Sequence, residues 1–135
     1  MREMLVSAAS LLAVALVSSA EAGDPEAGRE VYLNTCVSCH SMECNRRHYG
    51  PGLGNLLGRP AATFPDFPYY TDALRDSQIV WDVTTLDRWL ADPAALVPGT
   101  SMGDIAGIRT SVPDAEDRRN LIAYLLTGDT SLGIC

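Results

Sequence analysis

Five consecutive residues, Cys36-Val37-Ser38-Cys39-His40, carry the side chains best suited to chemistry in this chain. Two thiols three residues apart, followed at once by an imidazole, form the attachment pattern of a c-type haem. On one helical turn this spacing lets both sulfur atoms reach the two vinyl groups of one porphyrin, and the next residue directs a ring nitrogen at the iron. The pattern predicts one covalently attached haem c, with its iron held by His40.

Two other uses of a Cys-x-x-Cys pair stay open at this point. A structural zinc site needs a second pair of ligands at matching spacing, and the remaining cysteines, Cys44 and Cys135, are not paired in that way. A thioredoxin-like redox pair needs a preceding strand and a βαβ context, which the sequence lacks. Haem attachment is the interpretation that the pattern favours.

The beginning of the chain has the features of a secretory signal peptide. Arg2 precedes an almost wholly apolar or small stretch, 4–17, and Ala20-Glu21-Ala22 is an A-x-A cleavage site. We therefore expect a signal peptide over 1–22, a mature domain over 23–135 and a periplasmic location. The apolar stretch is short for a membrane span, so we expect no stable membrane insertion after cleavage, with an uncleaved anchor as the alternative.

Export has consequences for the cysteines and for the core. Disulfides are stable outside the cytoplasm, so Cys44 and Cys135 are a candidate pair, with two unpaired thiols as the alternative. A mature domain this small has little apolar surface of its own to bury. A large flat cofactor would therefore be part of the hydrophobic core.

The chain is acidic and contains no lysine. All ten of its basic residues are arginines, against 17 acidic residues, a formal net charge of −7. This balance argues against nucleic acid and anionic lipid surfaces as partners. It favours redox protein partners with basic or neutral docking faces, although an acidic surface that serves only solubility is the alternative.

The elements that must position these residues all read as helices and loops. Residue 28 is a glycine inside the first predicted helix, which suggests a close approach of another backbone. We expect a loop over 41–59, which contains His48, and we expect its glycines to lie where a side chain would not fit. The pattern shows no strands, and the predicted helices are 25–35, 71–78, a segment capped by Thr84 or Thr85 and ended by Pro93, and a last helix from 111–114 to Thr127.

The order of motifs resembles the class I, mitochondrial-type cytochromes c, close to the bacterial cytochromes c2. The resemblance covers nearly the whole predicted mature domain. It rests on CVSCH at 36–40, GPGL and LGR within 50–59, YTDA at 70–73, Trp81, PGTSM at 98–102 and LIAYL at 121–125. It implies an all-α fold of three main helices plus short ones and loops, wrapped around one covalently bound haem.

The resemblance also implies a role for individual residues. Cys36 and Cys39 would form the thioethers, and His40 and Met102 would be the two axial ligands. The Pro51 carbonyl would accept a hydrogen bond from the His40 ring. Three further side chains, Arg59, Tyr70 and Trp81, resemble the family's donors to the haem propionates. Thr100 lies on the loop that would hold the distal ligand.

The function implied is that of a monomeric single-electron carrier and not of an enzyme. The alternatives are a haem-based peroxidase or gas sensor with a labile distal ligand, and a cytochrome subunit of a dehydrogenase complex. Some positions depart from the family. Where lysines usually ring the haem edge the chain has Thr35, Ala94 and Ser101, and Trp89 stands where a tyrosine is usual. The tryptophan at position 89 is expected to alter the hydrogen bonding around the sulfur of Met102.

Overall fold

The computed structural model describes residues 22–42, 49–65, 67–103, 105 and 107–128. Most of the predicted signal peptide, His48 and the candidate Cys44–Cys135 pair lie outside this set. Within it the regular structure is helical, and the one β contact is an isolated bridge between Pro60 and Val80. The all-α prediction is confirmed. The elements in order are α1 (Pro25–Thr35), α2 (Asp72–Asp76), α3 (Val83–Ala91), α4 (Pro93–Leu96), the 3₁₀ turn η2 (Ser101–Gly103) and α5 (Ala115–Leu126).

Carboxylate caps begin the two long terminal helices. The Asp24 side chain accepts a hydrogen bond from the Glu26 N–H, and Pro25 takes the first helical position of α1. Asp114 accepts from two backbone N–H groups in the first turn of α5. After α5 the chain turns at Gly128, whose φ of 53° suits a residue without a side chain.

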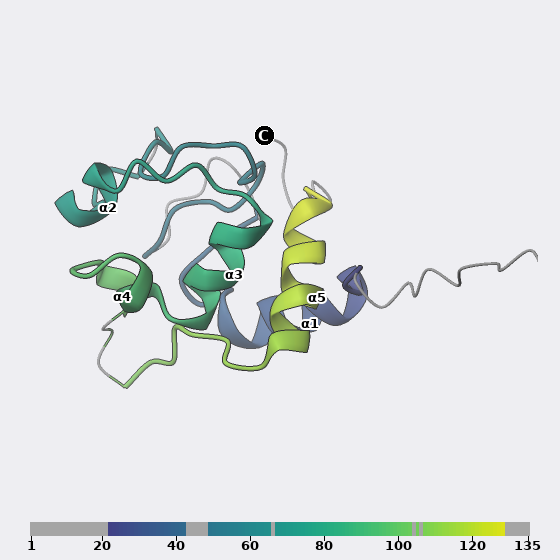
Figure 1. Ribbon diagram of the computed structural model, residues 1–135. Coiled ribbons are helices and arrows are strands. Elements are labelled where there is room, and N and C mark those ends of the chain that lie inside the picture. The colour runs from purple at the N-terminus through teal and green to yellow at the C-terminus, as the bar shows by residue number, and fades with distance from the viewer. Residues whose placement is uncertain (1–21, 43–48, 66, 104, 106, 129–135) are drawn as a thin grey trace, which may run out of the picture.

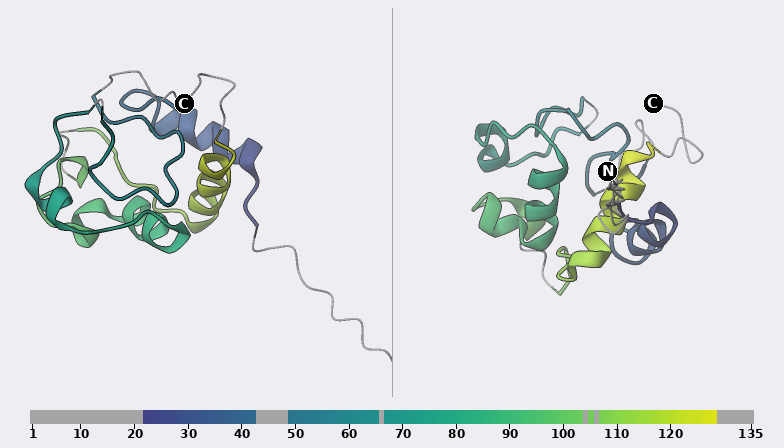
Figure 2. Two further views of the ribbon diagram at one scale, coloured as in Figure 1. Left: turned by 90° about the horizontal axis from the view of Figure 1, so that it is seen from above. Right: turned by 45° about the vertical axis from the view of Figure 1, so that its right-hand side comes forward.

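Helices α1 and α5 cross at close range, as the views in Figures 1 and 2 show. At the crossing Gly28 is buried, and a Cβ added there would overlap the backbone carbonyl of Asn120. The rings of Tyr32 and Tyr124 pack 5.5 Å apart beside it, and Leu121 is fully buried. The close approach predicted from Gly28 is therefore confirmed.

The start of α3 corrects the sequence prediction. Its N-cap is Asp82, whose carboxylate accepts from the Thr85 N–H at 2.7 Å. The Thr85 hydroxyl in turn accepts from the Asp82 N–H, forming a capping box. Thr85 therefore sits at the third helical position, and the prediction of Thr84 or Thr85 as the cap is wrong.

Two short helices also differ from the prediction, one in its length and the other because it was not predicted. Helix α2 is a single turn capped by Thr71, shorter than the expected 71–78. Pro93 follows the end of α3 as expected, but it also begins α4, with Asp92 as the cap. This extra turn leads the chain into the loop that carries Met102.

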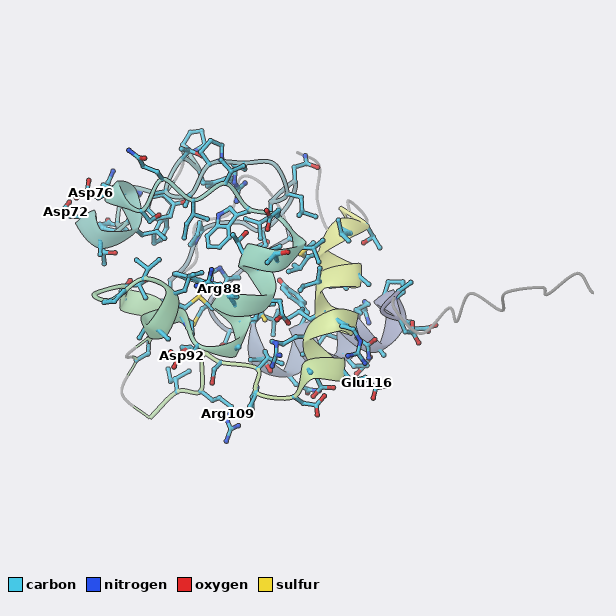
Figure 3. The ribbon with its side chains drawn as sticks, viewed as in Figure 1. Asp72, Asp76, Arg88, Asp92, Arg109 and Glu116 are labelled. Carbon is cyan, nitrogen blue, oxygen red and sulfur yellow. The ribbon has the colours of Figure 1, made fainter. Side chains whose placement is uncertain are left out.

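The surface of the described residues carries mixed charge. Figure 3 labels six exposed charged side chains, namely Asp72, Asp76, Arg88, Asp92, Arg109 and Glu116. An ion pair of 2.7 Å between Arg118 and Asp87 joins α5 to α3. Among the described residues, no helix combines the length and the apolar character needed to cross a membrane.

Candidate haem site

The helices and the long loops enclose a cavity of about 250 Å³, far larger than a neighbouring one of about 30 Å³ that has room for little more than a water molecule. Its walls come from the end of α1, the loop over 49–60, the segment 67–74, α3, the turn η2 and α5. Every predicted site residue lines it, namely Cys36, Cys39, His40, Pro51, Arg59, Tyr70, Trp81, Thr100 and Met102. Residues distant in sequence thus meet in one place.

The Cys-x-x-Cys-His segment continues the last turn of α1. The Cys36 N–H donates to the Tyr32 carbonyl, and the His40 N–H donates to the Cys36 carbonyl, both at 2.8 Å. Cys36 and Cys39 form no disulfide with each other. Burial, and to a lesser degree the nearby Cys39, raise the pKa of the Cys36 thiol to about 12. This turn places Cys36, Cys39 and His40 on the wall of one cavity.

The His40 ring lies in a fixed setting. Its Nδ1 is 2.8 Å from the Pro51 carbonyl oxygen, so Nε2 is the ring nitrogen suited to a metal. The Gly50 N–H donates to the Cys39 carbonyl and the Leu53 N–H donates to the Ser41 carbonyl, each at 2.8 Å. The hydrogen bond that the resemblance implied between His40 and Pro51 is thus present in the structure.

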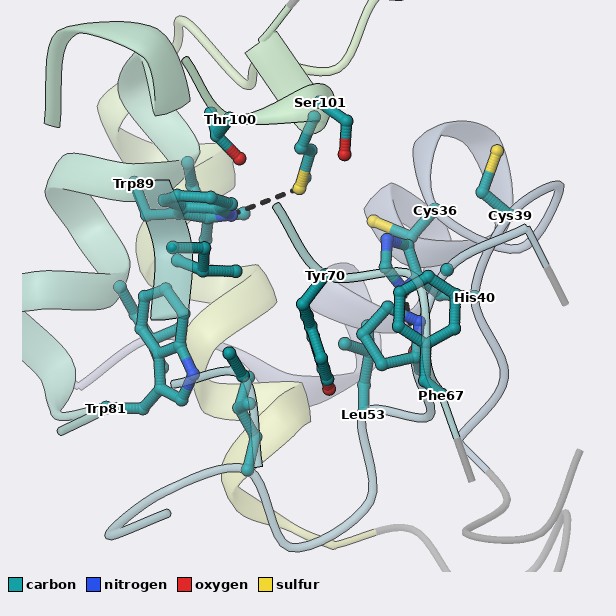
Figure 4. A pocket seen from close by; sticks show the side chains of 18 of the residues that line it. Cys36, Cys39, His40, Leu53, Phe67, Tyr70, Trp81, Trp89, Thr100 and Ser101 are labelled. Atoms are coloured by element: carbon teal, nitrogen blue, oxygen red, sulfur yellow. Dashed lines mark hydrogen bonds between the residues drawn. The ribbon is translucent and has the colours of Figure 1, made fainter. Parts of the chain in front are cut away.

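The opposite wall carries a thioether. Met102 lies in η2, and the Trp89 indole N–H donates to its sulfur at 3.1 Å (Figure 4). The Trp89 ring is buried and packs edge-on against Trp81, with the ring centroids 5.3 Å apart. Figure 4 shows Trp89 and Thr100 on one side of the cavity and His40 with the two cysteines on the other.

Polar groups gather along one edge of the cavity. The Arg59 guanidinium donates to the carbonyls of Gly52 at 2.9 Å and Gly54 at 3.2 Å. Burial lowers the pKa of Arg59 and raises that of the Tyr70 hydroxyl. The backbone N–H of Trp81 donates to the backbone carbonyl of Arg59, so these two predicted propionate donors are neighbours.

Two residues of this site were not among the predicted site residues. Trp89 was noted as a departure from the family that affects the hydrogen bonding around the distal sulfur, and in the structure its indole N–H donates to that sulfur. Gly50 was only one of several loop glycines expected to have a steric use, and the group that a side chain there would meet is the His40 ring. No sequence signal points to this second contact.

The donor set fits a haem. An imidazole and a thioether stand on opposite walls, two thiols lie beside the imidazole, and the remaining lining is mostly apolar and aromatic. A flat apolar macrocycle with two carboxylates needs this combination of apolar walls and a polar edge. The arrangement suits iron with nitrogen and sulfur ligands rather than a site for a small polar substrate.

Known proteins with similar sequences are named as c-type cytochromes. The chain is 36% identical over 122 residues to cytochrome c2 of Rhodomicrobium vannielii, covering 87% of this chain and 92% of that one. It is 35% identical over 109 residues to cytochrome c2 of Rhodopila globiformis, covering 81% and 97%. The chain belongs to the class I cytochromes c. As a class I cytochrome c it carries one covalently bound haem c and transfers electrons to redox partners; it is not an enzyme.

Two further comparisons bear on this cytochrome. It is 39% identical over 105 residues to the cytochrome c-type cyt cy of Rhodobacter capsulatus, and the match spans 78% of this chain but 49% of that relative. Among solved structures, cytochrome cH from Methylobacterium extorquens superposes with a TM-score of 0.68 at 35% identity, covering 78% of this chain and 99% of that one. No family model matches the chain.

Proposed function

We propose that this cytochrome is an exported single-electron carrier whose haem iron is held between Nε2 of His40 and the sulfur of Met102. The observation that carries the proposal is that both side chains line one cavity, in which His40 lies across from Trp89 and the Trp89 indole N–H donates to the Met102 sulfur. The Pro51 carbonyl orients the imidazole, and the Trp89 N–H orients the thioether. Cys36 and Cys39 would form the two thioether links.

The haem supplies an iron that changes oxidation state by one electron. If Nε2 of His40 and the Met102 sulfur both held the iron, no ligand position would remain for a substrate, which favours outer-sphere electron transfer. A methionine opposite a histidine stabilises the ferrous state, and an apolar site acts in the same direction. We therefore expect a positive reduction potential. Arg59, Tyr70 and Trp81 would compensate the propionate charges along the polar edge, and Thr100 would support the Met102 loop.

Optical spectra of the holoprotein test the ligands. We expect the weak red band of methionine-ligated ferric haem and little response of the reduced protein to carbon monoxide. Met102→Ala should lose the band and bind carbon monoxide. Met42→Leu is the matched control, because Met42 is buried but does not line the cavity. Ready binding of carbon monoxide by the unaltered protein would instead favour a peroxidase or gas sensor.

The cellular setting belongs to the same proposal. A mature chain beginning at Gly23 in a periplasmic extract, read by mass spectrometry, would support export and cleavage. The acidic composition suits partners with basic or neutral docking faces. Gel filtration of a native extract separates a free monomer, which we expect, from a subunit held in a dehydrogenase complex.

A further inference from the structure

The Gly50 backbone packs directly against the His40 imidazole. A Cβ added at Gly50 would lie 2.7 Å from Nδ1 and 2.9 Å from Nε2, with Cε1 closer still. Ordinary contacts of a side-chain carbon begin near 3.4 Å, so any residue other than glycine would collide with the ring. The contact involves ring atoms on both sides of Cε1.

The glycine is not needed for its backbone conformation. The positive-φ glycines of the described residues are Gly58, Gly99, Gly107 and Gly128, and Gly50 is not among them. An L residue could therefore adopt the backbone angles of position 50. What the position requires is the absence of a side chain.

The backbone at this position has little room to retreat. The Gly50 N–H is tied to the Cys39 carbonyl and the Leu53 N–H to the Ser41 carbonyl. On the other side, the Tyr32 hydroxyl donates to the His40 carbonyl at 2.9 Å. A side chain added at position 50 would therefore displace the His40 imidazole more readily than it would displace the backbone of either segment.

We propose that Gly50 is a positioning residue that sets the plane of the His40 ring and keeps Nδ1 within reach of the Pro51 carbonyl. The inference rests on the proposed function, because it concerns His40 as an iron ligand. The ring plane decides which iron orbital the imidazole overlaps, and the Nδ1 hydrogen bond sets how strongly Nε2 donates. A turned ring would change both properties without touching Met102.

Gly50→Ala tests the proposal in the holoprotein, with Gly28→Ala as the control. Both variants add one methyl group where it collides, but at Gly28 the collision is with the backbone of α5. Proton NMR of the ferric protein reads the ring plane through the pattern of paramagnetically shifted haem methyl signals. We expect Gly50→Ala to change that pattern and to raise the midpoint potential, since a weaker Pro51 hydrogen bond makes His40 a poorer donor. Gly28→Ala should lose stability and keep the pattern.

An unchanged methyl pattern in Gly50→Ala, or the same change in both variants, would overturn the proposal. If Gly50→Ala does not fold, proton NMR of the unaltered ferrous protein tests the proposal instead. A nuclear Overhauser contact between His40 Hε1 and the Gly50 Hα protons supports the proposal, and its absence refutes it. The shifted methyl signal of a bound methionine reports Met102 separately, so failure of the axial ligand set is distinguishable from failure of the Gly50 role.

Discussion

Gly28→Ala sets two opposing effects against each other at the crossing of α1 and α5. In an exposed helix, alanine in place of glycine stabilises by about 1 kcal/mol. Here the new Cβ would overlap the Asn120 carbonyl and lie 2.9 Å from the Leu121 nitrogen. Overpacking costs about 1–3 kcal/mol, and the upper end applies because backbone atoms cannot rotate away.

The helices would have to separate, which also loosens the contact between Tyr32 and Tyr124. Steric cost minus the gain in helix propensity leaves a loss of about 2 kcal/mol. For a domain of this size that corresponds to a fall in Tm of about 8 °C. Circular dichroism of the oxidised holoprotein during heating measures it.

An exposed position of the same helix supplies the control. Glu30→Ala and Glu30→Gly both remove the carboxylate, so the difference between them measures the preference for alanine over glycine in α1 without a steric term. We expect Glu30→Gly to be the less stable of the two by up to about 1 kcal/mol. If Gly28→Ala melted above the unaltered protein, helix propensity would be the dominant effect and the close-approach argument would be refuted.

Two further predictions concern the distal ligand and the helix caps. Trp89→Phe removes the hydrogen bond to the Met102 sulfur, which makes the thioether a better donor to ferric iron. If the effect of this bond on the ferric and ferrous states differs by about 0.5–1 kcal/mol, the midpoint potential should fall by about 20–40 mV. An unchanged potential in a redox titration would contradict this. Backbone N–H donors, chiefly those of Thr85 and Asp117 respectively, lower the pKa values of Asp82 and Asp114 in the folded state. Their contribution to stability is therefore present above about pH 4 and lost as the pH falls through the folded-state pKa values. Asp114→Asn keeps an oxygen that can accept the cap hydrogen bonds but removes the titrating carboxylate. Chemical denaturation should therefore show that the free energy of unfolding falls less steeply as the pH is lowered. An unaltered dependence on pH would count against the role of Asp114 as a cap.

The terminal helices were predictable because their signals are local. Asp24-Pro25 marks the start of α1, and the last helix has its cap and its apolar face within one short stretch. The start of α3 was misread because aspartate and threonine are both good caps, and a capping box uses both. Helix α4 was missed although Asp92-Pro93 repeats the signal at Asp24-Pro25, because the proline was read only as a stop.

The residues of the haem site and the hydrogen bond between His40 and Pro51 were predictable from motifs, but two other supporting contacts were not. Cysteine spacing and family motifs single out the side chains that line the cavity. The contact between Gly50 and His40, and the hydrogen bond from Trp89 to Met102, depend on how loops far apart in sequence come together. Neither is encoded by spacing or periodicity, so only the folded chain shows them.

The position of Cys36 ties the haem site to the crossing of the terminal helices. Cys36 is buried, with 8% of its surface exposed, and burial raises the pKa of its thiol to about 12. It lines the cavity together with Cys39 and His40 and continues the last turn of α1. A covalent link to a haem at this position would join the cofactor directly to the end of α1, so the haem and the contact between α1 and α5 would stabilise one another.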